Sequence, residues 1–139
     1  MTIRQLSVFL ENKPGYLDEM LSVLAENNIN IVALTIADTS DYGIVRLLVS
    51  NPQMALDKLR EKQYTVRIHH IISLEMEKKV GSLYKILDLF TRASINVEYI
   101  YAFSFGNKSI MVVRTDNQDK AAEVVRQHHL KPISEEELE

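Results

Sequence analysis

Two short loops carry the residue types in this sequence that are best suited to hold a small charged molecule. Glu11-Asn12-Lys13-Pro14-Gly15 aligns without a gap with Glu77-Lys78-Lys79-Val80-Gly81, 66 residues further on. Each loop precedes a segment with helical apolar spacing, so it would present the unpaired N–H groups and positive dipole end of a helix, which suit a carboxylate. Glycine allows close backbone approach, and asparagine offers both hydrogen-bond donors and an acceptor. The pattern favours binding over catalysis.

The same offset of 66 residues relates most of the chain to itself. Leu17 meets Leu83, and Ile29-Asn30 meets Ile95-Asn96. Further matches fall at turns and apolar positions, where a duplicated unit would keep them. We therefore expect one module over residues 1–69, a second over 70–134, and a short acidic tail over 135–139.

Each repeat contains the same succession of predicted elements. Repeat 1 reads as strands at 6–10, 31–37, 44–49 and 64–68, with one helix after Pro14 and another opened by Asn51-Pro52. Pro14 is expected at the first helical position, and Asp41-Tyr42-Gly43 has the composition of a hairpin turn. The order βαββαβ, twice, predicts an α+β fold of two tandem ferredoxin-like modules with antiparallel sheets.

The second strand of each repeat is apolar on both faces, which is unusual for a sheet covered on one side only. Repeat 1 alternates the set Ile31, Ala33, Thr35 with the set Val32, Leu34, Ile36, and one face of repeat 2 holds Val97, Tyr99, Tyr101, Phe103 and Phe105. A few tolerated surface hydrophobics would explain this pattern. We favour burial by a second sheet, hence a homodimer or higher oligomer through the open sheet faces. The aromatic stripe fits an interface or core better than a ligand cage.

The loop Leu10-Glu11-Asn12-Lys13-Pro14-Gly15-Tyr16-Leu17, followed by a helix and Asn28-Ile29-Asn30-Ile31, resembles the ACT domain. This small amino-acid-sensing module regulates many biosynthetic enzymes, and repeat 1 is similar to the regulatory domain of 3-phosphoglycerate dehydrogenase. The resemblance covers nearly the whole chain in two copies and implies a free-standing pair of ACT modules. It also implies that the modules join side by side into an eight-stranded sheet.

The resemblance places an amino-acid ligand between the first loop of one module and the start of the second strand of its neighbour. One such site would use Asn12, Lys13, Pro14, Gly15, Tyr16 and Leu17 with Asn96 and Val97. The other would use Lys78, Val80, Gly81, Ser82 and Leu83 with Asn30 and Ile31. Lys78 replaces Asn12 and has no acceptor for an ammonium group. We therefore expect one functional site around the Asn12 loop, or two of unequal affinity.

Simpler interpretations stand beside these assignments. Gly15 and Gly81 would serve as turn glycines in any case, and Asn30 and Asn96 could bond their own backbone before a strand. Lys78-Lys79 has the character of a solvated pair. The histidine that the family carries two residues before the loop asparagine is missing, since Leu10 and Met76 stand there, so the resemblance does not imply serine.

Composition and motifs weigh against other classes of function. The chain has no cysteine and a net charge of −3, which excludes thiolate chemistry and argues against nucleic-acid binding. The histidines form two adjacent pairs, His69-His70 and His128-His129, and each pair could offer only one ligand to a given point because neighbouring strand residues face opposite sides. No catalytic, cofactor or metal site is expected, nor a signal peptide or membrane span. The tail at 135–139 is expected to be solvated.

The sequence therefore predicts a cytoplasmic, non-catalytic protein that binds a small amino acid between two modules and passes that state to a partner enzyme of amino-acid metabolism. The alternatives are an assembly scaffold whose site has decayed, or a regulatory subunit without ligand binding of its own.

Overall fold

The computed structural model describes residues 2–38 and 41–138. By their internal contacts these residues form two units, Arg4–His70 (module 1) and Ile71–Leu138 (module 2, with which residues 2 and 3 also group). Both have the ferredoxin-like arrangement that the sequence predicts, which confirms the α+β fold class. Glu139, at the end of the expected tail, lies outside the described residues.

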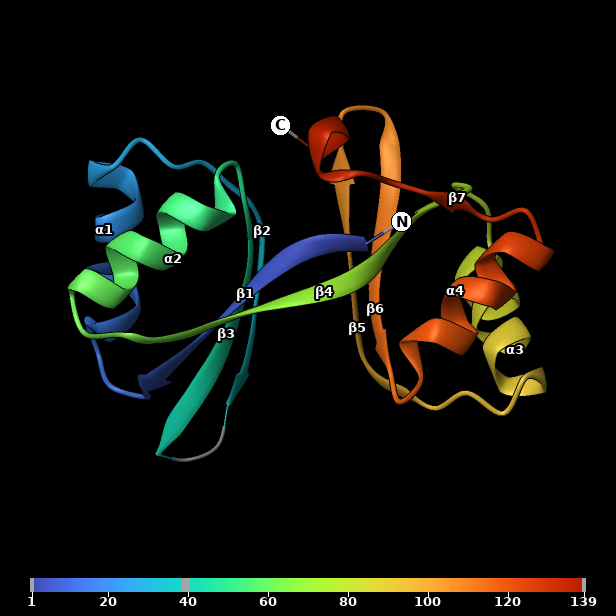
Figure 1. Cartoon of the computed structure of the whole chain (residues 1–139), viewed down its shortest axis with the longest axis horizontal. Coiled ribbons are helices and arrows are strands. Elements are labelled where there is room, and N and C mark those ends of the chain that lie inside the picture. Colours follow the sequence, from blue (N-terminus) through green and yellow to red (C-terminus); the bar gives the residue numbers. More distant parts are fainter. Residues whose placement is uncertain (1, 39–40, 139) are drawn as a thin grey trace. The chain divides into compact units, whose positions relative to one another are not determined.

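Module 1 is a four-stranded antiparallel sheet with two helices on one face (Figure 1). Its elements are β1 (Thr2–Glu11), α1 (Tyr16–Glu26), β2 (Ile31–Asp38), β3 (Tyr42–Val49), α2 (Pro52–Glu61) and the first half of β4 (Thr65–Met76). The strand order is β2-β3-β1-β4. Leu6, Val8, Leu47, Met20 and Leu59 are fully buried between sheet and helices, as their alternating and helical spacings predict.

Module 2 repeats this plan with the second half of β4 as its first strand. Its further elements are α3 (Ser82–Arg92), β5 (Val97–Phe105), β6 (Lys108–Thr115), α4 (Gln118–Gln127) and β7 (Lys131–Pro132). The strand order is β7-β4-β6-β5, and Ile72, Leu74, Phe90, Met111 and Val113 form the centre of its core. Asn51 and Asn117 cap the second helix of each module by accepting from the N–H of Met54 and Lys120.

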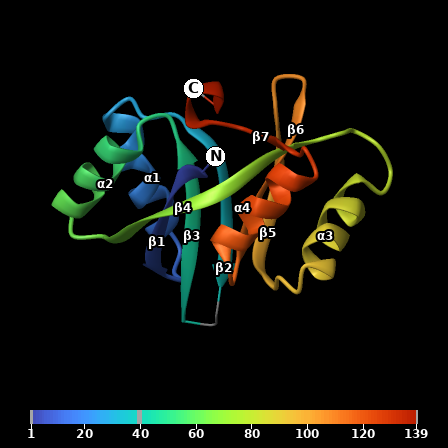
Figure 2. The same cartoon turned by 45° about the vertical axis from the view of Figure 1, so that its right-hand side comes forward.

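The described residues form seven strands rather than eight, because β4 is continuous. The last strand of module 1 and the first of module 2 are the two halves of this 12-residue strand, drawn as a single arrow in Figure 2. The division between the modules falls inside it, between His70 and Ile71. The sequence of neither repeat predicts that β4 is continuous, since each half of β4 taken alone is an ordinary strand.

The entry to the first helix of each module differs from the expectation for Pro14. Pro14 lies outside the helix: the N–H of Tyr16 bonds the carbonyl of Lys13, and Gly15 has φ 86° and ψ −14°. Proline followed by glycine at these positions is typical of a type II turn, whose third residue needs positive φ. Module 2 has the same turn. The N–H of Ser82 donates to the carbonyl of Lys79, and Gly81 has φ 88°.

The hairpin turn predicted at Asp41-Tyr42-Gly43 is wrong for two of its residues. Tyr42 and Gly43 lie in β3, where Gly43 pairs with Leu10 of β1 and with Asp38 of β2. Pairing on both sides holds this stretch extended, which overrides the turn preference of its glycine.

A register shift in β2 and another in β5 alter the expected strand faces. The shifts lie between Ile31 and Ala33, and between Val97 and Tyr99. Ile31 and Val97 therefore pack against the helix-covered cores, and the aromatic stripe on the opposite face of β5 begins only at Tyr99. A bulge moves every preceding side chain to the other face, so strict alternation assigned these two residues wrongly.

The acidic tail is more ordered than expected. Glu135–Leu138 forms a 3-10 turn, Leu138 is buried, and Glu137 lies 3.6 Å from the ammonium of Lys108. Burial of one leucine side chain is enough to hold this short segment against the chain.

Replacing Gly81 by alanine should lower the free energy of unfolding by about 1 kcal/mol, because a Cβ is strained at positive φ. A Cβ there would meet no atom within 4 Å, so backbone strain alone sets the cost. Urea unfolding measures it. Gly43→Ala is the control: its φ is not positive and its Cβ would make ordinary contacts of 3.5 Å. Equal stabilities of the two variants would contradict the turn assignment.

Candidate functional site

The two loops have nearly identical frames of polar contacts. Glu11 pairs with Lys13 at 3.0 Å, and Glu77 pairs with Lys79 at 3.1 Å. The hydrogen bond to Glu11 raises the pKa of Lys13, whose ammonium also lies 6.0 Å from the centre of the Tyr16 ring. The N–H of Asn12 donates to the carbonyl of Asp41. These contacts fix the backbone on both sides of the turn.

The helix that follows each loop begins without a side-chain cap, since Gly15 and Gly81 stand at the N-cap positions. Backbone N–H groups of the first turn, such as those of Leu83 and Tyr84, have no acceptor among the described residues. They lie at the positive end of the helix dipole, where a carboxylate binds well. The first turn of α1 contains Asp18 and Glu19, whereas that of α3 contains no acid.

The asparagines before the second strands are held by their backbones. Asn30 N–H donates to the Ser50 hydroxyl at 2.9 Å, and the Ser50 N–H donates to the Asn30 carbonyl at 2.9 Å. At the equivalent positions of module 2, Asn96 N–H donates to the Asp116 carboxylate at 3.0 Å, and Asp116 N–H returns a bond to the Asn96 carbonyl at 3.0 Å.

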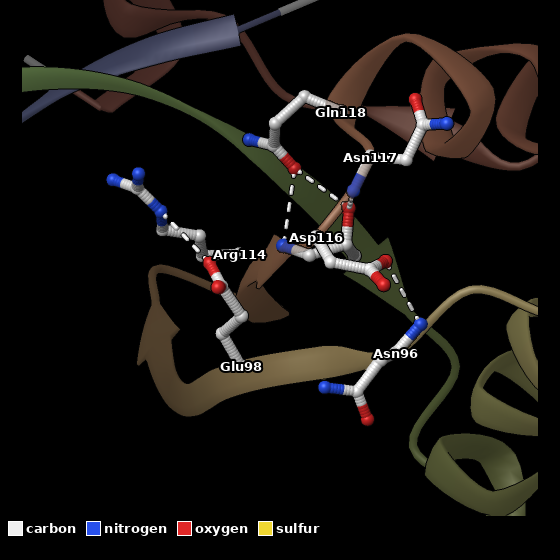
Figure 3. A network of polar contacts seen from close by, with 7 residues as sticks. Asn96, Glu98, Arg114, Asp116, Asn117 and Gln118 are labelled. Atoms are coloured by element: carbon white, nitrogen blue, oxygen red, sulfur yellow. Dashed lines mark hydrogen bonds and ion pairs between the residues drawn. The ribbon is translucent and has the colours of Figure 1, made fainter.

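The side chain of Asn96 takes no part in this pairing. In Figure 3 its carboxamide points away from the Asp116 carboxylate, and within the described residues it has no partner. The interpretation that this side chain bonds its own backbone is therefore wrong. A donor and an acceptor remain available for a ligand at the start of β5.

A polar network behind Asp116 fixes the connection from β6 to α4 (Figure 3). The Gln118 side-chain oxygen accepts from both the N–H and the hydroxyl of Thr115, at 3.2 and 3.1 Å. Asn117 N–H donates to the Thr115 hydroxyl at 3.3 Å. Arg114 pairs with Glu98 across the two strands at 3.2 Å. This network rigidifies the backbone that orients Asn96.

Within one module the loop and the asparagine lie at opposite ends of the sheet. Met76, just before the second loop, pairs with Ser109 at the start of β6, whereas Val97 pairs with Thr115 at its end. Six residue steps of a strand span about 20 Å. Module 1 has the same separation along β3, from Gly43 to Val49. A small ligand therefore cannot touch the loop and the asparagine of the same module.

The structure brings the predicted loop residues of module 2 together around a hollow. This open hollow of about 620 Å³ is lined by the predicted site residues Lys78, Val80, Gly81, Ser82 and Leu83, together with Met76, Glu77, Lys79, Tyr84 and Ser109. Val80 is fully exposed and Ser82 half-buried. In module 1, Asn12, Lys13, Pro14 and Gly15 form the exposed turn, and Tyr16 and Leu17 begin α1.

A second pocket, of about 350 Å³, lies beside the same loop and was not predicted. Its lining includes Glu75, Lys85, Leu130 and Lys131, which the sequence did not single out, and His129, which the sequence pointed to only as one of an adjacent histidine pair. Their signal was available in the differences between the repeats, since Lys85 stands where module 1 has Glu19 and Leu130 where it has Tyr64.

The part of the chain that the structure describes contains no group of three or more His, Asp or Glu side chains arranged to hold a metal ion. None of its helices is long and apolar enough to span a membrane.

Asp116→Ala should destabilise the protein by about 0.5–1 kcal/mol, because the Asn96 N–H loses a charged acceptor at a solvent-exposed site. Asp116→Asn keeps an oxygen at the same place and should retain most of the stability. Urea unfolding of both variants measures the difference. Equal losses in the two would show that the Asn96–Asp116 bond contributes nothing.

Known proteins are similar to this chain over nearly its full length. A family model of the ACT domain pair matches residues 1–139. A protein from Bacteroides thetaiotaomicron is 36% identical, with a TM-score of 0.93 over 99% of this chain and 96% of that one. No curated protein sequence is significantly similar.

Two regulatory subunits of aspartate kinase share the fold at low identity. The ligand-free subunit from Thermus thermophilus has a TM-score of 0.62 at 15% identity, over 89% of this chain and 91% of that one. The subunit from Thermus flavus has a TM-score of 0.59 at 16% identity, over 91% and 92%. Since a family model covers the full length, and two ferredoxin-like modules repeat the same loop and turn, the chain belongs to the ACT domain pair family.

Proposed function

We propose that this ACT domain pair is a regulatory protein that binds a small amino acid in sites combining residues of two modules. One site uses Asn12, Lys13, Pro14, Gly15, Tyr16 and Leu17 with Asn96 and Val97. Its counterpart uses Lys78, Val80, Gly81, Ser82 and Leu83 with Asn30 and Ile31. The second module of a site belongs to the same chain or to a second copy.

The observation that carries this proposal is the separation of loop and asparagine within each module. Both features are suited to ligand binding, and about 20 Å of strand lies between them. Only a loop from one module and an asparagine from another can therefore meet on one amino acid. A ligand that bridges modules stabilises their arrangement, which is how binding becomes a regulatory signal.

The chemistry of the two ends fits a zwitterion. First-turn N–H groups of the helix and the dipole behind them receive the carboxylate. The carboxamide oxygen of Asn96, which has no partner among the described residues, accepts from the ammonium group. The contact with Asp116 keeps the backbone of Asn96 in place while its side chain turns to the ligand.

The two sites are expected to differ in affinity. Asn12 can hold either end of an amino acid, whereas Lys78 at the equivalent position only donates. The ring of Pro14 also restricts the backbone of the unfolded chain, so its turn forms with a smaller loss of conformational entropy than the turn that contains Val80. The Asn12 site is therefore the stronger candidate.

The regulated partner is proposed to be an enzyme of amino-acid metabolism in the cytoplasm. This proposal is supported by the two similar structures that are regulatory subunits of aspartate kinase, which this chain covers over 91% and 92% of their lengths. No catalytic role is proposed for this chain.

Assembly of several copies through the sheet face that carries Tyr99, Tyr101, Phe103 and Phe105 is part of this proposal. These side chains are half-buried and alternate with exposed Glu98, Ala102 and Ser104. The same stripe favours the alternative function, a non-catalytic scaffold or regulatory subunit that needs no ligand of its own.

A thermal-shift screen against the twenty amino acids at millimolar concentration tests the function. An amino acid at 100 times its dissociation constant should stabilise the protein by about 2.7 kcal/mol, which is several degrees for a chain of this size. Asn12→Ala and Asn96→Ala should each remove the shift caused by the strongest ligand.

Ser50→Ala is a matched control, since it changes a residue next to Asn30 and leaves the stronger site intact. It should keep that shift. A flat response to all twenty amino acids would overturn ligand sensing and favour the scaffold, and a shift unaffected by either asparagine variant would place the ligand elsewhere.

A further inference from the structure

We propose that module 2 has a further binding site for a small organic carboxylate with an apolar body, in the pocket of about 350 Å³ between the start of α3 and the connection from α4 to β7. Val80 and Ser82 line this pocket and also belong to the proposed amino-acid site of the second loop. All of its lining residues belong to module 2. The site is therefore complete within one module, unlike the amino-acid sites proposed above.

The pocket has an apolar floor and a basic rim. Met76, Ile86 and Leu130 contribute apolar surface continuous with the core of module 2. The rim contains Lys79, Lys85, Lys131 and His129, together with the carboxylates Glu75 and Glu77. In Figures 1 and 2 the loop after β4, the start of α3 and the end of α4 lie at the same end of the module. A volume of this size suits a small metabolite.

Two of the equivalent positions of module 1 are occupied by larger side chains. Tyr16 stands in place of Ser82, and Tyr64 in place of Leu130. Tyr64 packs against the core of module 1, and burial followed by the nearby Glu19 raises the pKa of its phenol. Module 2 has thus exchanged two tyrosines for smaller residues at the same place in the fold, which leaves space beside α3.

The charge in the first turn of the helix also has opposite sign in the two modules. Glu19 of module 1 corresponds to Lys85 of module 2, and the acids in the first turn of α1 have no counterpart in α3. Neither Lys85 nor Lys131 forms an ion pair among the described residues. A lysine at the uncapped, acid-free start of a helix favours one anionic group.

The carboxylates of the rim decide against a phosphate or a second negative charge. Glu77 is paired with Lys79 at 3.1 Å, whereas Glu75 lies opposite Lys131 in the pairing of β4 with β7 without forming an ion pair with it. Three lysines and two carboxylates give the rim one net positive charge beside the start of α3, which matches a single carboxylate. The apolar floor then receives a branched or aromatic body.

NMR titration of the full-length protein with 4-methylpentanoate tests the proposal. The backbone amides of Lys85, Ile86 and Leu130 should shift together along one saturating curve. 4-Methylpentanamide, which has the same shape without the charge, should bind at least about tenfold more weakly. Leucine should also bind more weakly, because its ammonium group meets the lysine rim.

Two variants replace a pocket residue of module 2 by the residue that module 1 has at the equivalent position. Lys85→Glu should weaken binding of 4-methylpentanoate at least about tenfold, and Leu130→Tyr should abolish it by filling the pocket. Lys120→Glu, an equal charge reversal in the exposed first turn of α4, should leave the affinity unchanged. Asn12→Ala and Asn96→Ala should also leave it unchanged, which separates this site from the amino-acid site of the Asn12 loop.

Absence of saturating shifts at Lys85, Ile86 and Leu130 would overturn the proposal. Equal binding of the uncharged amide, or equal weakening by Lys120→Glu, would show that no specific carboxylate contact exists. Stronger binding of leucine at these residues would overturn the proposed ligand class.

Discussion

Backbone hydrogen bonds between β4 and β6 hold Met76 opposite Ser109, and those between β6 and β5 hold Thr115 opposite Val97. Much of what each module can do depends on this antiparallel register. It places the loop before α3 at one end of the sheet and Asn96 at the other, and the register of module 1 does the same for Gly15 and Asn30. A site that combines a loop with an asparagine, as proposed above, therefore needs two copies of the module.

The polar groups at the two ends of the sheet are organised differently. At the loop end, the turn around Gly81 leaves the helix N–H groups without a side-chain cap, which creates a place for an anion. At the other end, the Asp116 carboxylate holds the backbone of Asn96, whose carboxamide has no partner among the described residues. In both cases the backbone is held while other polar groups remain available, and a held backbone loses less conformational entropy in the proposed ligand binding.

The two modules share a frame but differ in what fills it. Turn, caps and strand register are the same, because they depend on glycine, asparagine and backbone pairing at corresponding positions. Side chains beside the first helix have diverged, with Tyr16, Glu19 and Tyr64 of module 1 replaced by Ser82, Lys85 and Leu130. These three replacements leave the core position beside them unchanged in kind, since Met20 and Ile86 are both buried there. A duplicated module can thus keep its fold and acquire a second kind of surface.

The sequence by itself determined the repeat, the order βαββαβ, the helix start at Asn51 and the turn glycines, because these follow from local conformational preference and apolar spacing. It also located the loop and asparagine residues that the structure presents at the ends of the sheet. Tertiary structure alone decided that β4 is continuous, that Tyr42 and Gly43 belong to a strand, and that bulges turn Ile31 and Val97 into the cores. The pocket beside α3 also emerged only there, because long-range strand pairing and packing bring together segments that no local pattern relates.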